Sequence, residues 1–203
     1  MAGGGLEEMT VVPRSAVRFP LPMPTPEGFV VSEPSRWPAV AGRLEYVEGR
    51  LLFMPPCGDE QQQTAVDVVT ELNLWRRAHP DFVVGGNEAG MLLGGEVRAA
   101  DAAVWRRVDV GDATGGFPRV APLLAVEVAG QDERTVDLAE KARWYLAHGV
   151  LVVWILDPRA RTVAVLEGGT RQDLGLGGAI PAHAALPGLA PRVDDLFRQV
   201  TGG

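Results

Sequence analysis

Apolar and polar positions recur along the chain with the period of two typical of strands and with the period of about 3.6 typical of helices. The first such pattern lies after residue 42. The runs 43–48 and 50–54 are short, β-prone and separated by one glycine, which predicts a tight hairpin. From 59 to 79 the apolar residues recur at helical spacing and Pro80 follows. This spacing predicts a helix, with Asp59 as its N-cap.

The middle of the chain has the composition of a sheet. The segments 82–84, 91–93 and 97–105 are rich in apolar and β-branched residues, and the pairs Gly85-Gly86 and Gly94-Gly95 separate them. Because glycine pairs favour turns, we expect three strands here.

A strand–helix–strand unit follows. Segment 123–128 is an apolar strand with one acid, 135–148 has an apolar helical face, and 150–156 is apolar enough to be buried on both faces. The two strands should be parallel with a right-handed crossover. Segment 162–166 is expected to pair with the second strand, and 193–200 to form a short closing helix or strand.

The N-terminal segment has a different composition. Residues 1–38 contain seven prolines, which deny the backbone the donors that helices and central strands need. We therefore predict a proline-rich arm at 1–42 and one domain at 43–203. The length of 203 residues fits a single domain of this kind.

Composition excludes several classes of protein. The formal net charge of −7 argues against a protein that coats nucleic acid through a basic surface. No apolar run approaches the ~20 residues of a membrane span, the N-terminus lacks the pattern of a secretory signal, and Cys57 is the single cysteine. We expect a soluble protein of the reducing cytoplasm.

Two acids occupy apolar strands. Glu127 lies within PLLAVEVAG and Asp101 within RAADAAVW, and an isolated buried carboxylate costs several kcal/mol unless it is paired, protonated or bound to metal. Their separation of 26 positions suffices for two adjacent strands, and Lys141 follows Glu127 by 14 positions, in the predicted helix. The crossover can therefore bring Lys141 back over Glu127.

Such a group of residues has two interpretations. Two carboxylates with open positions suit Mg²⁺ or Mn²⁺, and a nearby lysine can neutralise charge on a phosphate, which favours metal-assisted phosphodiester hydrolysis. The alternative is structural: Glu127 and Lys141 form a buried ion pair and Asp101 caps a turn. A surface i,i+4 pair with Asp137 would also explain Lys141.

Three blocks of sequence carry a resemblance to a known family. RLEYVEGRLLFMPP, RAADAAVW and LLAVEVAGQDERTVDLAEKARWYLAHGVLVVWILDP resemble, in order and spacing, the Uma2 family of restriction endonucleases, a branch of the PD-(D/E)XK nuclease superfamily. The match covers about residues 43 to 167. Its most specific part contains Glu127, Lys141, Tyr145, Trp154 and Asp157.

The resemblance implies a fold and a site. The fold is a restriction-endonuclease-like α/β domain, with a mixed β-sheet core flanked by helices. Asp101, Glu127 and the main-chain carbonyl of Val128 would bind Mg²⁺ or Mn²⁺, Lys141 would supply positive charge, and Glu45 would be a further acid. The implied activity is divalent-metal-dependent hydrolysis of DNA, and cutting both strands would suit a homodimer.

The sequence departs from the family pattern at three places. Ala100 replaces the proline that normally precedes the first metal-binding Asp, and Ala129 stands at the third position of the ExK motif. A histidine often found before the first helix is replaced around Gln62 or Gln63. These departures support an alternative function, a catalytically inactive nuclease fold that binds nucleic acid or protein.

Overall fold

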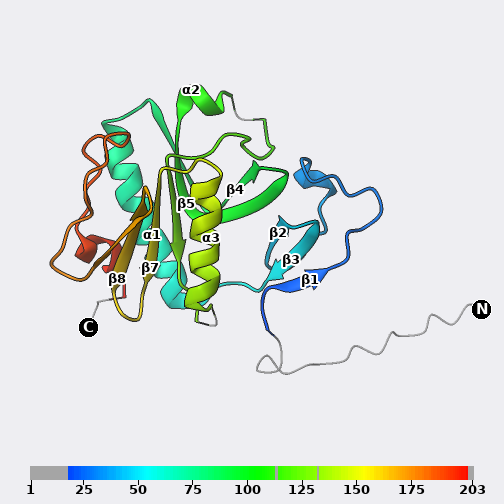
Figure 1. The fold of residues 1–203 in the computed structure, drawn as a ribbon, viewed down its shortest axis with the longest axis horizontal. Helices are drawn as coiled ribbons and strands as arrows, with labels where there is room; N and C mark the ends of the chain where they lie inside the picture. The colour runs from blue at the N-terminus through cyan, green and yellow to red at the C-terminus, as the bar shows by residue number, and fades with distance from the viewer. Residues whose placement is uncertain (1–17, 113, 132, 201–203) are drawn as a thin grey trace, which may run out of the picture.

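The computed structural model describes residues 18–112, 114–131 and 133–200. Its sheet of nine strands has the order β1-β3-β2-β5-β6-β7-β8-β9, and β4 pairs with β5 outside this path (Figure 1). The strands are β1 (Leu21–Met23), β2 (Arg43–Val47), β3 (Arg50–Met54), β4 (Phe82–Leu93), β5 (Glu96–Arg106), β6 (Leu124–Val128), β7 (Val152–Asp157), β8 (Thr162–Glu167) and β9 (Thr170–Leu174). The helices are α1 (Asp59–Arg77), α2 (Arg107–Val110) and α3 (Thr135–Ala147), with short 3-10 turns η2 (Pro34–Arg36) and η3 (Val193–Phe197).

Local sequence signals account for most of these elements. The predicted hairpin is confirmed as β2 and β3, which join through Glu48 and Gly49, both at positive φ. The predicted strand–helix–strand unit is confirmed as β6, α3 and β7, with its two strands parallel. A mixed α/β sheet flanked by helices is therefore confirmed.

The first helix begins one residue away from its predicted cap. Gly58 is the N-cap of α1, and Asp59 is the first helical residue. Asp59 and Glu60 then place acids in the first turn, where they interact favourably with the positive end of the helix dipole.

The prediction of separate strands at 82–84 and 91–93 is wrong, because β4 runs through Gly85 and Gly86 and bulges after them. These glycines allow close packing. A Cβ on Gly85 would lie 2.8 Å from Trp105, and one on Gly86 would lie 2.9 Å from Val69. A glycine pair in a sequence thus has two meanings, and only the fold distinguishes a turn from a close approach.

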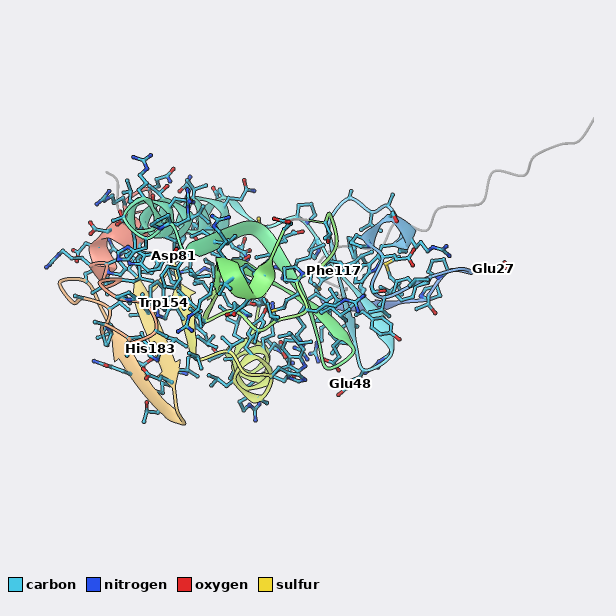
Figure 2. All side chains as sticks on the ribbon, turned by 90° about the horizontal axis from the view of Figure 1, so that it is seen from above. Glu27, Glu48, Asp81, Phe117, Trp154 and His183 are labelled. Carbon is cyan, nitrogen blue, oxygen red and sulfur yellow. The ribbon has the colours of Figure 1, made fainter. Side chains whose placement is uncertain are left out.

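Helices cover both faces of the sheet, and each face has its own core. The face beneath α1 packs Val68 and Leu72 against Val126 and Trp154. The opposite face packs Ala142 and other residues of α3 against Ala103 and Ala125. Figure 2 shows α1 and α3 on opposite sides of the sheet. None of the described helices is long and apolar enough to cross a membrane.

Candidate active site

The sheet divides at β5. One edge of β5 pairs with β4, while the other edge is shared between two strands. Val97 pairs with Tyr46 of β2, and residues 102–104 pair with β6. Between these pairings β2 and β6 separate, so residues 98–101 of β5 have no strand partner on this edge. We call this opening the fork.

Polar side chains bond the main-chain groups that the fork leaves without a strand. The Glu45 Oε1 atom accepts a hydrogen bond from the Ala99 amide at 3.2 Å, and Asp101 Oδ2 accepts one from the Val128 amide at 2.7 Å. Gln61, in the first turn of α1, donates its Nε2 to the Val128 carbonyl at 3.0 Å. Buried backbone groups require such partners, and here side chains supply them.

Asp101 and Glu127 lie side by side across the fork. The β5–β6 register pairs Ala102 with Val126, so its extension by one residue sets Asp101 opposite Glu127. Opposed residues of antiparallel strands project from the same face. In this case the face is the one that α3 covers.

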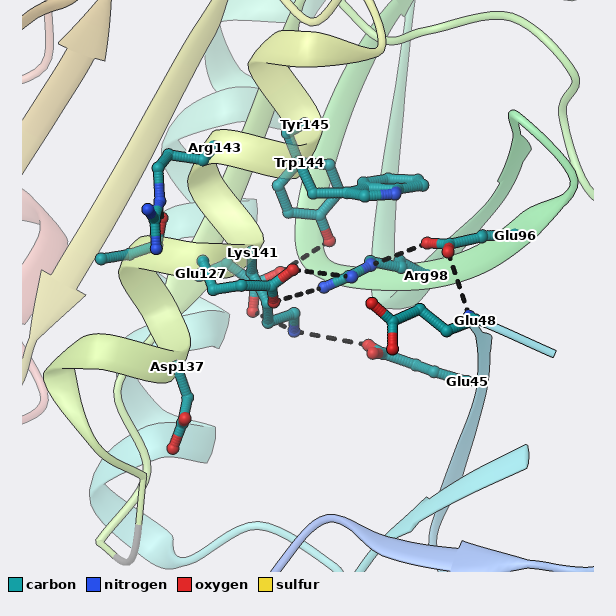
Figure 3. Close-up of polar contacts among 12 residues, drawn as sticks. Glu45, Glu48, Glu96, Arg98, Glu127, Asp137, Lys141, Arg143, Trp144 and Tyr145 are labelled. Atoms are coloured by element: carbon teal, nitrogen blue, oxygen red, sulfur yellow. Dashed lines mark hydrogen bonds and ion pairs between the residues drawn. The ribbon is translucent and has the colours of Figure 1, made fainter. Parts of the chain in front are cut away.

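Helix α3 supplies both partners of the Glu127 carboxylate, which is 1% exposed. Lys141 Nζ lies 2.7 Å from Oε2, and the Tyr145 hydroxyl donates to Oε1 at 2.7 Å. The two residues are four apart and therefore share one helix face. Figure 3 shows both side chains reaching from α3 toward Glu127, and Glu45 reaching Lys141 from β2.

Further ion pairs join these groups into one cluster. Lys141 Nζ lies 3.4 Å from Glu45 Oε1, and Arg43 lies 3.9 Å from the same oxygen. Arg43 also lies 3.6 Å from Asp101 Oδ1. Glu133 binds the Gly130 amide at 3.1 Å and interacts electrostatically with Lys141. We call Arg43, Glu45, Asp101, Glu127, Glu133 and Lys141 the carboxylate cluster.

The acids of this cluster differ in their ionisation. Burial raises the pKa of Asp101, of Glu127 and of Glu133, because desolvation outweighs the attraction of the nearby cations. Burial also opposes ionisation of Glu45, but Lys141 and Arg43 together hold its pKa below the ordinary value. Two cations thus face four carboxylates, and full ionisation leaves a formal charge of −2.

The lysine stays charged despite its burial. Desolvation alone would lower the pKa of Lys141, yet Glu127 and Glu45 hold it above its ordinary value. Burial and the neighbouring Glu127 carboxylate raise the pKa of Tyr145 well above its usual range, so the hydroxyl remains a donor. Glu127 therefore lies between a fixed ammonium and a neutral phenol.

The cluster lies at a cleft with a volume of about 840 Å³. Arg43, Glu45, Asp101, Glu133 and Lys141 all line it, whereas Glu127 lies behind them. Its walls come from α1, from β2 and β3, and from Phe19 and Pro20 before β1. A cleft of this size, with convergent charged groups, has the properties of a ligand site.

A family model described as "Putative restriction endonuclease", the Uma2 family, matches residues 31–194. The chain belongs to the Uma2 family. The crystal structure of a protein from Anabaena variabilis ATCC 29413, described as "a putative nuclease belonging to DUF820", has the same fold. The TM-score is 0.72 at 18% identity, over 82% of this chain and 96% of that one. No functionally curated protein matches the sequence.

The resemblance to the Uma2 family implied five site residues, and the structure brings all of them together. Asp101, Glu127, Lys141, Glu45 and the Val128 carbonyl surround the fork. Whether they act in catalysis or bind metal stays a prediction. The surface pair between Asp137 and Lys141 is wrong, because Asp137 bonds Arg134 instead.

Sequence reasoning missed other members of the site. Arg43 and Glu133 lie in loop or strand-end positions with no motif to mark them, although Glu133 follows Glu127 within the same block of sequence. Gln61, and not Gln62 or Gln63, faces the fork, since Gln62 bonds the Cys57 carbonyl outside it. Which of these three glutamines faces the fork depends on how α1 is rotated about its axis, and the sequence does not give that rotation.

The donor set of this Uma2 member fits a divalent ion. Mg²⁺ and Mn²⁺ prefer hard oxygen ligands, and Asp101, Glu127 and the Val128 carbonyl provide them beside an excess of negative charge. Each of these oxygens already accepts one hydrogen bond or ion pair, but carboxylate and carbonyl oxygens have a further lone pair. Within the described ranges, no three His, Cys, Asp or Glu side chains converge as a metal site, so the carbonyl would complete the set.

Proposed function

We propose that this protein is a divalent-metal-dependent endonuclease that hydrolyses phosphodiester bonds in DNA. The observation that carries the proposal is the fork, where Asp101 and Glu127 project from the same face with Lys141 beside them. The match to a restriction-endonuclease family supports the same activity.

Each residue has a distinct part in this reaction. Asp101, Glu127 and the Val128 carbonyl would hold Mg²⁺ or Mn²⁺, which would polarise the phosphodiester and supply a more acidic water. Lys141 is a poor general base because its pKa is raised, so it acts as a fixed positive charge for the developing phosphorane. Tyr145 and Lys141 together fix the orientation of Glu127.

Glu45 has a supporting part. It stays ionised and touches both Lys141 and the Ala99 amide, so it keeps the ammonium charged and holds β2 against β5. We place it among the positioning residues, because it acts through Lys141 and through the Ala99 amide.

The test compares metal binding with cleavage in the same proteins. Wild type should bind Mn²⁺ in calorimetry and cut supercoiled plasmid, and Asp101→Asn and Glu127→Gln should lose both, with at least a ~100-fold fall in rate. Asp173→Asn is the matched control, since that acid lies in an exposed pair with Arg171 on β9. A wild type that neither binds Mn²⁺ nor cuts would contradict the proposal.

One observation favours a second function, an inactive nuclease fold that binds nucleic acid or protein. Every proposed ligand oxygen has a protein partner: Lys141 and Tyr145 on Glu127, Val128 on Asp101, and Gln61 on the Val128 carbonyl. The Mn²⁺ titration separates the two functions, because a site closed by these bonds would give no heat of binding.

A further inference from the structure

The charges that line the cleft do not suit a DNA duplex. Among the described residues that line it, seven are acidic and four are basic. The bases are all paired with acids of the protein: Arg43, Arg50, Arg98 and Lys141. Duplex-binding proteins rely on many free Lys and Arg side chains that neutralise phosphates. Among the residues that the structure describes, the one place in this cleft that could bind a phosphate is the carboxylate cluster, where the proposed Mg²⁺ or Mn²⁺ would lie.

The dimensions of the cleft also suit one strand better than a whole duplex. A volume of 840 Å³ corresponds to a cube about 9 Å on an edge, which is the scale of a small-ligand site. The major groove of B-form DNA is itself about 12 Å wide, so the whole duplex is broader than this space. A single strand can bring a phosphate and its bases into this space together, whereas a duplex can present only its outer backbone to the opening.

The walls have the chemistry of a surface for unpaired bases. Apolar side chains face the cleft from three separate elements: Phe19, Leu52, Met54, Ala65, Val66 and Val69. Val66 is 54% exposed on α1, so its side chain is available to a ligand. The faces of unstacked bases are apolar and can pack against such walls, where Phe19 supplies an aromatic ring for stacking, whereas a duplex hides these faces.

We propose that the substrate enters this cleft as a single strand, with unstacked bases against the apolar walls and one phosphodiester at the carboxylate cluster. This inference rests on the proposed nuclease function and narrows its substrate. It explains how an acidic protein can act on a polyanion, because only one or two phosphates need to be neutralised.

The test uses fluorescence anisotropy with the full chain in Ca²⁺, which takes oxygen ligands. The probe is a labelled DNA strand of about 16 nucleotides, alone or annealed to its complement. We expect the single strand to bind at least ~10-fold more tightly, with a salt slope shallower than about −2, because few phosphates are contacted. Equal or tighter binding of the duplex would overturn the inference.

A pair of variants on one helix links this preference to the cleft. Val66→Glu adds a charge to the apolar wall and should weaken single-strand binding at least ~10-fold, because it removes apolar contact and repels phosphate. Leu74→Glu makes the same change at a position on α1 that is 46% exposed and outside the cleft, and should leave binding within about twofold. Equal effects of the two variants would overturn the assignment to this cleft.

The outcomes keep this inference separate from the proposed function. A protein that binds Mn²⁺ and cuts, but prefers the duplex, remains a nuclease and refutes only the single-strand inference. A protein that binds no Mn²⁺ and cuts nothing refutes the nuclease, and the inference falls with it.

Discussion

Two parts of the same sheet satisfy their backbone hydrogen-bonding groups in different ways. In β6, β7 and β8 each strand bonds its neighbours, and apolar side chains fill both faces. In the fork the neighbouring strand is missing, and carboxylates and an amide bond the backbone instead. The strand-paired region gains stability from apolar burial. The fork places carboxylates where desolvation opposes their ionised form.

The difference marks the fork as a place where buried charge opposes stability. A neutral amide can also bond these backbone groups, as Gln61 does, yet the chain retains four acids there. Burial raises the pKa of three of them, and their excess of negative charge would attract a cation. The comparison predicts that the loss of unfolding free energy depends on pH, or on a second substitution, for changes in the fork and not for changes in the strand-paired region.

The largest effect is expected in the strand-paired region. Trp154 is 2% exposed on β7 and packs in the core beneath α1. Trp154→Ala should lower the free energy of unfolding by about 4–5 kcal/mol, because it leaves a large cavity. Urea unfolding at neutral pH measures this loss. A loss below about 2 kcal/mol would show that the core there collapses around the smaller side chain.

The next effect belongs to the buried ion pair. Lys141→Met leaves Glu127 without its cation and should cost about 3 kcal/mol, since a buried charge without a partner is strongly destabilising. Glu127→Gln in the same chain should recover most of that loss, because the amide is neutral. Urea unfolding of the single and double variants gives the coupling free energy. Additive losses would mean that the pair contributes no specific interaction.

The smallest effect is a dependence on pH at Asp101. Burial raises its pKa, so the folded chain binds this proton more tightly than the unfolded chain. Its favourable contribution is complete below the ordinary carboxyl pKa of about 4 and is lost as pH rises through the raised value. Asp101→Asn cannot titrate at this position. Its free energy of unfolding should therefore rise relative to that of wild type between pH 4 and pH 7.5, as measured by urea unfolding without metal. A constant difference across this range would contradict the shift.

Local patterns predicted the strand-paired region well. The single acid in an apolar strand, the helical face of 135–148 and the apolar run 150–156 specify β6, α3 and β7 directly. Each signal lies within one element, and the right-handed crossover then fixes their arrangement. The positions of Glu127 and Lys141 follow from this unit.

The fork could not be predicted in the same way. It depends on β5 having β2 and β6 on one edge, and this pairing joins residues that are distant in the sequence. Arg43 and Gln61 belong to the site only because of that pairing, so no local pattern marks them. The continuous course of β4 through two glycines has a related explanation, since these glycines lie against Trp105 of β5 and Val69 of α1, which only the fold brings together.

Prolines at the start of the described chain have a consequence for how the molecule avoids association. β1 pairs with the outer edge of β3, and Pro22 lies in the middle of β1 with Pro20 and Pro24 on either side. An edge strand that lacks amide donors is a poor template for a further strand. A chain shortened to begin at residue 43 would instead present Leu51, Leu52 and Phe53 on an open edge, where copies can add to one another and aggregate.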